Sequence, residues 1–186
     1  MILITGAAGK TGKSILAALT MRGTKVRAFV RTSQQADDVK KLGKPEIVIG
    51  DLRNLADIEK AMIGVNRVYY IAPNMAPDEL EIGKKLIDLA RRNNVERFVY
   101  HSVLHPQIEA MPHHWQKMRV EEQLFTSGLD FTIMQPCSYM QNILGGWNAI
   151  VNNGKYIVPY SVNARLSIID LDDVAEAAAN VLTQLT

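Results

Sequence analysis

The chain has 186 residues, enough for one domain with a sizeable core but too few for two. Apolar residues make up 47% of the chain and charged residues 22%, which is typical of a soluble globular protein and argues against disorder. The net charge of +2, with no basic stripe interleaved with aromatics, argues against nucleic-acid binding, and no apolar run approaches the roughly 18 residues of a membrane span.

The cysteine content and the N-terminal sequence both favour a cytoplasmic protein. Cys137 is the only cysteine, so no intramolecular disulfide can form, which fits a reducing compartment. Met1 leads straight into an apolar run with no basic segment, so no signal peptide is recognisable. We therefore expect a single cytoplasmic domain over residues 1–186.

Six short runs rich in Val, Ile, Phe and Tyr are predicted to be strands. They are apolar on both faces, as expected for parallel strands covered by helices on each side. The runs are Met1–Thr5, Lys25–Val30, Glu46–Ile49, Arg67–Ile71, Arg97–Ser102 and Phe131–Gln135.

Stretches of helical periodicity with recognisable ends alternate with these strands. They cover Thr11–Met21, Gln34–Leu42, the segment capped by Asn54 and closed by Gly64, the segment from Leu80 to Asn93, Pro112–Gly128 and the segment after Asp170. The alternation predicts an α/β fold, a doubly wound parallel sheet with helices on both faces and right-handed crossovers. Another layered α/β fold is the alternative.

The first strand ends in a glycine-rich turn, Gly6-Ala7-Ala8-Gly9-Lys10-Thr11-Gly12, which opens a helix. One glycine permits the tight turn, the next lets the backbone approach a pyrophosphate, and the last lets helix and strand pack closely. Phosphates then meet the free N–H groups at the helix N-terminus. The turn therefore predicts dinucleotide binding, with a plain glycine-rich turn as the alternative.

The end of the second strand indicates which dinucleotide is preferred. Sites for NAD usually place Asp or Glu there, to bind the ribose hydroxyls. This strand ends instead in Arg31, whose guanidinium matches a 2′-phosphate, and Lys10 in the turn adds a second positive charge. We expect NADP(H) as the cofactor, with NAD(H) binding more weakly; the alternative is that Arg31 is only a solvated charge.

Several segments together resemble the NmrA-like branch of the atypical short-chain dehydrogenase/reductases, which have the Rossmann NAD(P)-binding fold. The resemblance runs from Met1 to about Leu182 and is most specific from Lys117 to Asn142. The segments that carry it are Gly6–Gly12, Val26–Arg31, Gly50–Leu52, Ile71–Asn74, Phe98–Ser102, Lys117–Ile133 and Pro136–Asn142.

The resemblance implies a role for each matching residue. Asp51 and Leu52 would flank the adenine, Ala72 to Asn74 would line the nicotinamide side, Lys117 would hold the nicotinamide ribose, and Pro136 to Tyr139 would close over the ring. The full set of expected cofactor-binding residues is Gly6, Ala8, Gly9, Lys10, Thr11, Gly12, Arg31, Asp51, Leu52, Ala72, Pro73, Asn74, Ser102, Lys117, Pro136, Cys137, Ser138 and Tyr139.

The sequence departs from the family pattern in two ways. Reductases of the wider superfamily use a Tyr-x-x-x-Lys pair, in which the lysine lowers the phenol pKa so that the tyrosine donates a proton. Here Lys117 is kept but His113 stands four residues before it, so Lys117 and His113 are the candidate catalytic residues. The resemblance also implies that most of the usual C-terminal substrate lobe is absent.

We expect an NADPH-dependent oxidoreductase acting on a small, electron-poor, quinone-like acceptor, because such an acceptor needs little protonation by the protein. The alternatives are a non-catalytic NADP(H) sensor that binds a protein partner and an α/β interaction module without nucleotide. No metal site is expected, since His101 and His105 have no carboxylate partner at ligand spacing. A homo-oligomer is possible, and neither nucleic acid nor membrane is expected as a partner.

Overall fold

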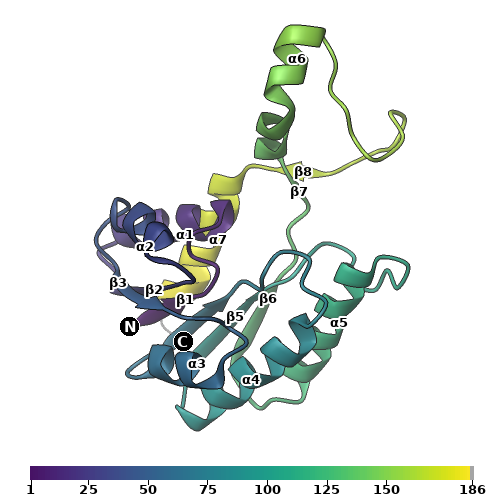
Figure 1. Cartoon of the computed structure of the whole chain (residues 1–186). Coiled ribbons are helices and arrows are strands. Elements are labelled where there is room, and N and C mark those ends of the chain that lie inside the picture. Colours follow the sequence, from purple (N-terminus) through teal and green to yellow (C-terminus); the bar gives the residue numbers. More distant parts are fainter. Residues whose placement is uncertain (185–186) are drawn as a thin grey trace.

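The computed structural model describes residues 1–184 and is built on a six-stranded parallel sheet (Figure 1). The strand order is β3-β2-β1-β4-β5-β6, and each neighbouring pair runs parallel. The strands are β1 (Ile2–Ile4), β2 (Val26–Val30), β3 (Glu46–Ile49), β4 (Arg67–Tyr70), β5 (Arg97–His101) and β6 (Phe131–Met134). All six predicted strands are thus present, and the predicted doubly wound fold is confirmed.

Within residues 1–184, six helices pack against the two faces of this sheet. They are α1 (Lys10–Met21), α2 (Ser33–Lys40), α3 (Leu55–Met62), α4 (Glu79–Arg92), α5 (Pro112–Phe125) and α7 (Leu171–Thr183). Asn54 caps α3 with its side-chain oxygen, as expected, and Asp170 caps α7 in the same way. The prediction for α5 was wrong at its end, because the helix stops at Phe125 and Gly128 follows in the left-handed region at φ +75°.

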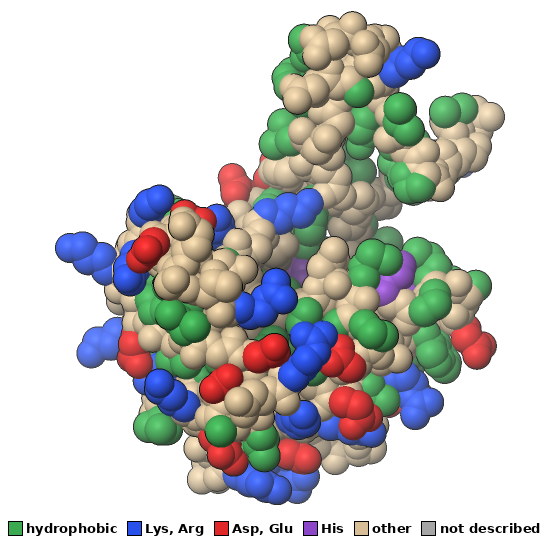
Figure 2. Space-filling model, viewed as in Figure 1, with side chains coloured by type: hydrophobic (Ala, Val, Ile, Leu, Met, Phe, Trp, Pro, Cys, Tyr) green, Lys and Arg blue, Asp and Glu red, His purple; other side chains and the backbone are tan. Residues whose placement is uncertain are grey.

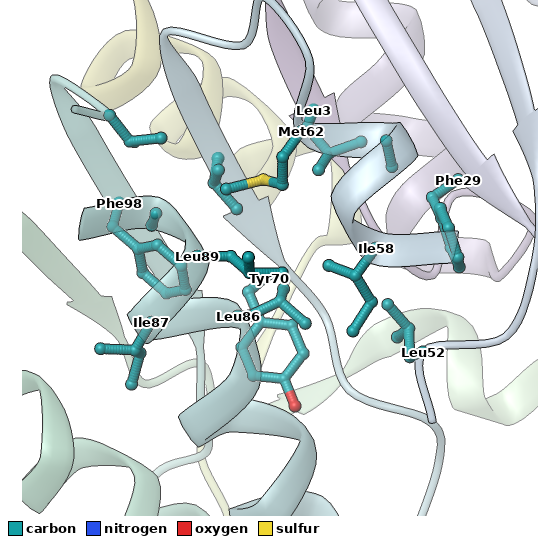
Figure 3. Close-up of a cluster of buried hydrophobic side chains, with 14 of the residues drawn as sticks. Leu3, Phe29, Leu52, Ile58, Met62, Tyr70, Leu86, Ile87, Leu89 and Phe98 are labelled. Carbon is teal, nitrogen blue, oxygen red and sulfur yellow. The ribbon is translucent and has the colours of Figure 1, made fainter. Parts of the chain in front are cut away.

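Two hydrophobic cores lie on the opposite faces of the sheet. One contains Leu3, Tyr70, Phe98 and Tyr100 and packs under α3, α4 and α5 (Figure 3). The other contains Ile4, Val30, Tyr69 and Val99 and packs under α1, α2 and α7. Successive residues of β4 and β5 therefore point to opposite faces, as the strand period of two requires.

The strand order reverses between β1 and β4, which are neighbours in the centre of the sheet. The chain leaves β1 toward one face through α1 and leaves β4 toward the other face through α4. The loops at the carboxyl ends of these two strands therefore diverge and leave a crevice, the usual ligand site of such sheets.

The segment between β6 and α7 contains elements that the sequence analysis did not predict. Two short strands, β7 (Ser138–Tyr139) and β8 (Ile168–Ile169), pair in parallel, and between them lie a 3₁₀ helix, η1 (Met140–Gly146), and α6 (Trp147–Asn153). We call residues 140–167 the arm. It projects away from the six-stranded sheet, and hydrophobic side chains are exposed along it (Figures 1 and 2).

None of the helices within residues 1–184 has the length and apolar character needed to cross a membrane.

Candidate functional site: a crevice at the strand ends

A crevice of about 810 Å³ opens at the carboxyl edge of the sheet. Its walls come from the turn after β1 and from the ends of β2, β3, β4 and β5, with α5 and β7 at one end. Of the residues expected to bind cofactor, those that line it are Gly6, Ala8, Gly9, Lys10, Thr11, Gly12, Arg31, Asp51, Leu52, Ala72, Pro73, Asn74, Ser102, Lys117 and Tyr139. The fold thus gathers segments far apart in the sequence along one continuous surface.

The glycine-rich turn forms a bare backbone cradle at the centre of the crevice. Gly6 lies at φ +60°, and a Cβ on Gly12 would stand 2.3 Å from the Gly6 carbonyl oxygen, so a side chain at either position would be strained. Gly9 is the N-cap of α1 and has no side chain to bond the first N–H groups of the helix. These unpartnered donors and the close-packed backbone fit a pyrophosphate.

Arg31 lies at the end of the crevice formed by β2. Its backbone N–H donates to Gln35 Oε1 at 2.8 Å, and its side chain is exposed. Within residues 1–184 its guanidinium forms no ion pair, so its donors are available to an anion in the crevice. The preference for NADP(H) over NAD(H) stays a prediction.

An ion pair between two loops holds the wall of the crevice beside Asp51 and Leu52 in place. Arg53 donates to both carboxylate oxygens of Asp78, at 2.7 and 3.0 Å, and the loop after β3 is thereby joined to the segment before α4. The hydrogen bonds from Arg53 lower the pKa of Asp78. Both side chains are substantially exposed, so the pair shapes the rim beside Asp51 and Leu52 more than it stabilises the fold.

Lys117 projects from α5 to the other end of the crevice and is paired with a buried acid. Its Nζ lies 2.8 Å from Glu79 Oε1 and 3.4 Å from the carbonyl oxygen of His101. Glu79 is 1% exposed and also accepts from Tyr100 Oη at 2.6 Å. Since a lysine ammonium has three N–H donors, one remains for a ligand in the crevice.

His113, the other candidate catalytic residue, also lines the crevice, one turn before Lys117 on α5. Partial burial, together with the neighbouring charges of His114 and Lys117, lowers its pKa. The imidazole is therefore neutral at neutral pH, and it would enter a reaction as a weak acid rather than as a cation.

The structure separates some of the residues expected to act together. Tyr139 lines the crevice, whereas Pro136, Cys137 and Ser138 do not, so their contact with the cofactor stays a prediction. Lys10 donates to Asn142 in the arm, and its ammonium lies 5.5 Å from the centroid of the Tyr139 ring. In this arrangement the Lys10 charge lies toward the arm and not beside Arg31.

Sequence reasoning missed a hydrogen-bonded chain of three side chains. His101 at the end of β5 bonds Tyr69 through Nδ1 and Tyr139 through Nε2, each at 2.7 Å. His101 has no assigned role in the sequence analysis. In the described part of the chain, no group of three potential ligands that could hold a metal occurs. The available signal was the parity of neighbouring strands, which puts Tyr69 and His101 on the same face of the sheet.

A doubly wound sheet with a glycine cradle beside its switch point defines the Rossmann class of fold. Within that class the sequence identifies the family. Residues 1–186 match the NmrA-like family along their whole length, and the chain belongs to that family.

Known proteins similar to this chain are longer than it. The NAD(P)H azoreductase of Xenophilus azovorans is 28% identical over 186 residues, a match covering 99% of this chain and 64% of the relative. Photosystem II assembly factor Ycf39 of Cyanophora paradoxa is 26% identical over 182 residues, covering 94% and 56%. The crystal structure of NADPH-dependent quinone oxidoreductase from Escherichia coli with NADPH has a TM-score of 0.86 at 24% identity, covering 100% and 66%. The chain thus spans less than two thirds of each relative.

Proposed function

We propose that this chain binds NADP(H) in the strand-end crevice and acts as an NADPH-dependent oxidoreductase on a small, electron-poor, quinone-like acceptor. The observation that carries the proposal is the continuity of the crevice. At one end of the crevice, an unpaired arginine matches a phosphate. In the middle, a bare helix N-terminus matches a pyrophosphate. At the other end, a lysine with a free donor matches a ribose. The azoreductase and quinone oxidoreductase relatives support the same reading.

Different residues of the crevice would bind different parts of the dinucleotide. Arg31 would hold the 2′-phosphate through two N–H groups, and the backbone of Gly9 to Gly12 would hold the pyrophosphate. Lys117, fixed by Glu79, would orient the nicotinamide ribose with its remaining donor. The bound dinucleotide, when reduced, supplies a hydride.

Helix α5, which carries Lys117 and His113, offers little acid–base machinery for a demanding acceptor. His113 is neutral and stands where the wider superfamily has a tyrosine. An acceptor whose reduced form is a stabilised anion makes the smallest demand on such a helix, because its reduction needs no strong acid. This feature favours quinone-like acceptors over simple ketones.

The test is to mix the protein with NADPH and a panel of quinones and to follow absorbance at 340 nm. We expect protein-dependent loss of NADPH with at least one quinone, and a much slower loss with cyclohexanone. Binding of NADPH without turnover of any quinone would contradict the oxidoreductase proposal.

A second function is favoured by the exposed apolar arm. In that case the chain would bind NADP(H) without turnover and use the arm to contact a protein partner, a reading consistent with the relative named as an assembly factor. The same assay separates the two functions, because a sensor would bind NADPH and consume none. For either function we propose a cytoplasmic location, which the single cysteine favours.

A further inference from the structure

The hydroxyl of Tyr139 is oriented by two other side chains of the protein. It enters the crevice from β7, and its Oη lies 2.7 Å from His101 Nε2 and 3.5 Å from Thr11 Oγ1. These two partners come from the ends of β5 and the start of α1, both rigid parts of the fold. The direction of each hydrogen bond determines where the Tyr139 proton points.

The imidazole of His101 carries a single N–H proton, on either Nδ1 or Nε2. Burial, aided by the charge of Lys117, lowers the pKa of His101 to about 3, so the ring is neutral at any physiological pH. A neutral imidazole donates through one nitrogen and accepts through the other. The partner at Nδ1 therefore decides whether Nε2 donates to Tyr139 or accepts from it.

The partner at Nδ1 is the hydroxyl of Tyr69, at 2.7 Å. Burial raises the pKa of Tyr69, so this hydroxyl stays protonated. Its one proton can go to His101 Nδ1 or to Met134 Sδ, which is 3.4 Å away. A thioether sulfur is a weak acceptor and an imidazole nitrogen a strong one, so Tyr69 donates to Nδ1. The His101 proton then lies on Nε2 and is donated to Tyr139.

Tyr139 therefore accepts a hydrogen bond from His101, and the Thr11 hydroxyl, directed at the Tyr139 oxygen from 3.5 Å, is too distant to be a good acceptor for the Tyr139 proton. The proton is left to point into the crevice. Burial raises the pKa of Tyr139, which keeps this donor in its protonated form. Lys10, with its ammonium 5.5 Å from the ring centroid, adds a positive charge beside any negative charge that develops there.

We propose that Tyr139 is a catalytic residue that donates a hydrogen bond, and then its proton, to an oxygen of the electron acceptor. Tyr69 and His101 are positioning residues that set the direction of this donor. The role in reduction rests on the proposed function, whereas the direction of the hydrogen bonds does not.

The proton balance of the step is simple. An acceptor that gains a hydride from the nicotinamide carries the new negative charge on an oxygen. The O–H bond of Tyr139 breaks, a new O–H bond forms on the acceptor, and the phenolate keeps the hydrogen bond from His101. A proton from solvent then restores the phenol. The chain thus places its proton donor on β7, and not on α5 where the wider superfamily has it.

The first experiment measures the histidine tautomer and needs no turnover. Protein labelled with ¹⁵N-histidine gives long-range ¹H–¹⁵N spectra in which the His101 signals are assigned by their loss in His101→Phe. We expect His101 with a bare Nδ1 and a protonated Nε2, unchanged between pH 6 and 8, and a shift toward a mixture of tautomers in Tyr69→Phe. A protonated Nδ1 in the wild type would overturn the proposal, whatever the activity.

The second experiment measures the reaction with NADPH and 1,4-benzoquinone. Tyr139→Phe should lower kcat about 100-fold, the effect typical of losing one oriented donor, with NADPH affinity within about twofold of wild type. Tyr160→Phe removes a hydroxyl in the arm, outside the crevice, and is the matched control with unchanged kcat.

The outcomes separate this inference from the proposed function. Wild-type turnover with Tyr139→Phe within twofold of it would overturn the role of Tyr139 and leave the proposed function standing. Absence of turnover in the wild type would remove the reaction and the catalytic role together, while the tautomer would still decide the direction of the hydrogen bonds.

Discussion

The sheet and the arm belong to one chain but differ in how their apolar side chains are covered. Leu3 and Ile4 in the centre of the sheet are 0% exposed, whereas Ile157 and Val162 in the arm are 81% and 91% exposed. The sheet is closed on both faces by its own helices, and the arm has no comparable intramolecular cover (Figure 2). The structural demands on each residue should therefore be strict in the sheet and weak in the arm.

A glycine in each region gives the largest expected contrast. In Gly12→Ala the new Cβ would stand 2.3 Å from a backbone oxygen, so the turn must shift, at a cost of about 1–3 kcal/mol in the free energy of unfolding. Displacement of the helix N-terminus should also reduce NADPH affinity more than about 100-fold.

The matched control is Gly145→Ala in the arm, where a Cβ meets nothing within 4 Å and the unfolding free energy should change by less than about 0.5 kcal/mol. Urea unfolding and NADPH titration of both variants provide the measurement. Equal stability and affinity in the two variants would show that the turn is not the close-packed cradle described here.

The sheet was predictable from the sequence because each strand and helix carries its own periodicity. The glycine spacing and Arg31 likewise predicted two parts of the crevice lining, the turn after β1 and the end of β2, since both depend on local chain order. The chain Tyr69–His101–Tyr139 was not predictable in this way, because it joins three strands through contacts between 32 and 38 residues apart in sequence. The arm was missed because its short elements lack a buried face to impose a pattern.

The lysine of the crevice should matter more for reaction than the neighbouring histidine. Lys117→Ala should lower turnover about 100-fold and weaken NADPH binding, because the nicotinamide ring loses its orientation. His113→Ala should change the rate less than about tenfold with a quinone, since the proposed proton donor is Tyr139 and not His113. Steady-state rates with NADPH for the two variants make the comparison.

The pairing of Lys117 with Glu79 calls for a second variant. Removal of the lysine leaves a carboxylate that is 1% exposed without its cation, which is strongly destabilising. The double variant Lys117→Met, Glu79→Gln removes both charges and should restore stability while turnover stays low. Activity lost in His113→Ala but kept in Lys117→Ala would reverse the two roles.

The arm should promote self-association. We expect each arm residue replaced to change the free energy less than the substitutions described above. Exposed apolar patches of this kind usually mark an interface, so light scattering should report a dimer or larger species. The double variant Ile157→Ser, Val162→Ser should shift the protein toward the monomer. Met21→Ser replaces an equally exposed apolar residue on α1 and should leave the mass unchanged. A wild-type monomer at all concentrations would contradict this role of the arm.

Calorimetric titration of NADPH and NADH into the wild type and Arg31→Ala tests the central claim, that the strand-end crevice holds NADP(H), most directly. A bidentate contact from Arg31 to the 2′-phosphate should contribute about 1.5–3 kcal/mol, so the wild type should bind NADPH roughly 10- to 150-fold more tightly than NADH. Arg31→Ala should lose this preference, and Arg92→Ala, an exposed arginine at the end of α4, should keep it. Equal affinity of the wild type for the two nucleotides, or binding of neither, would contradict the account.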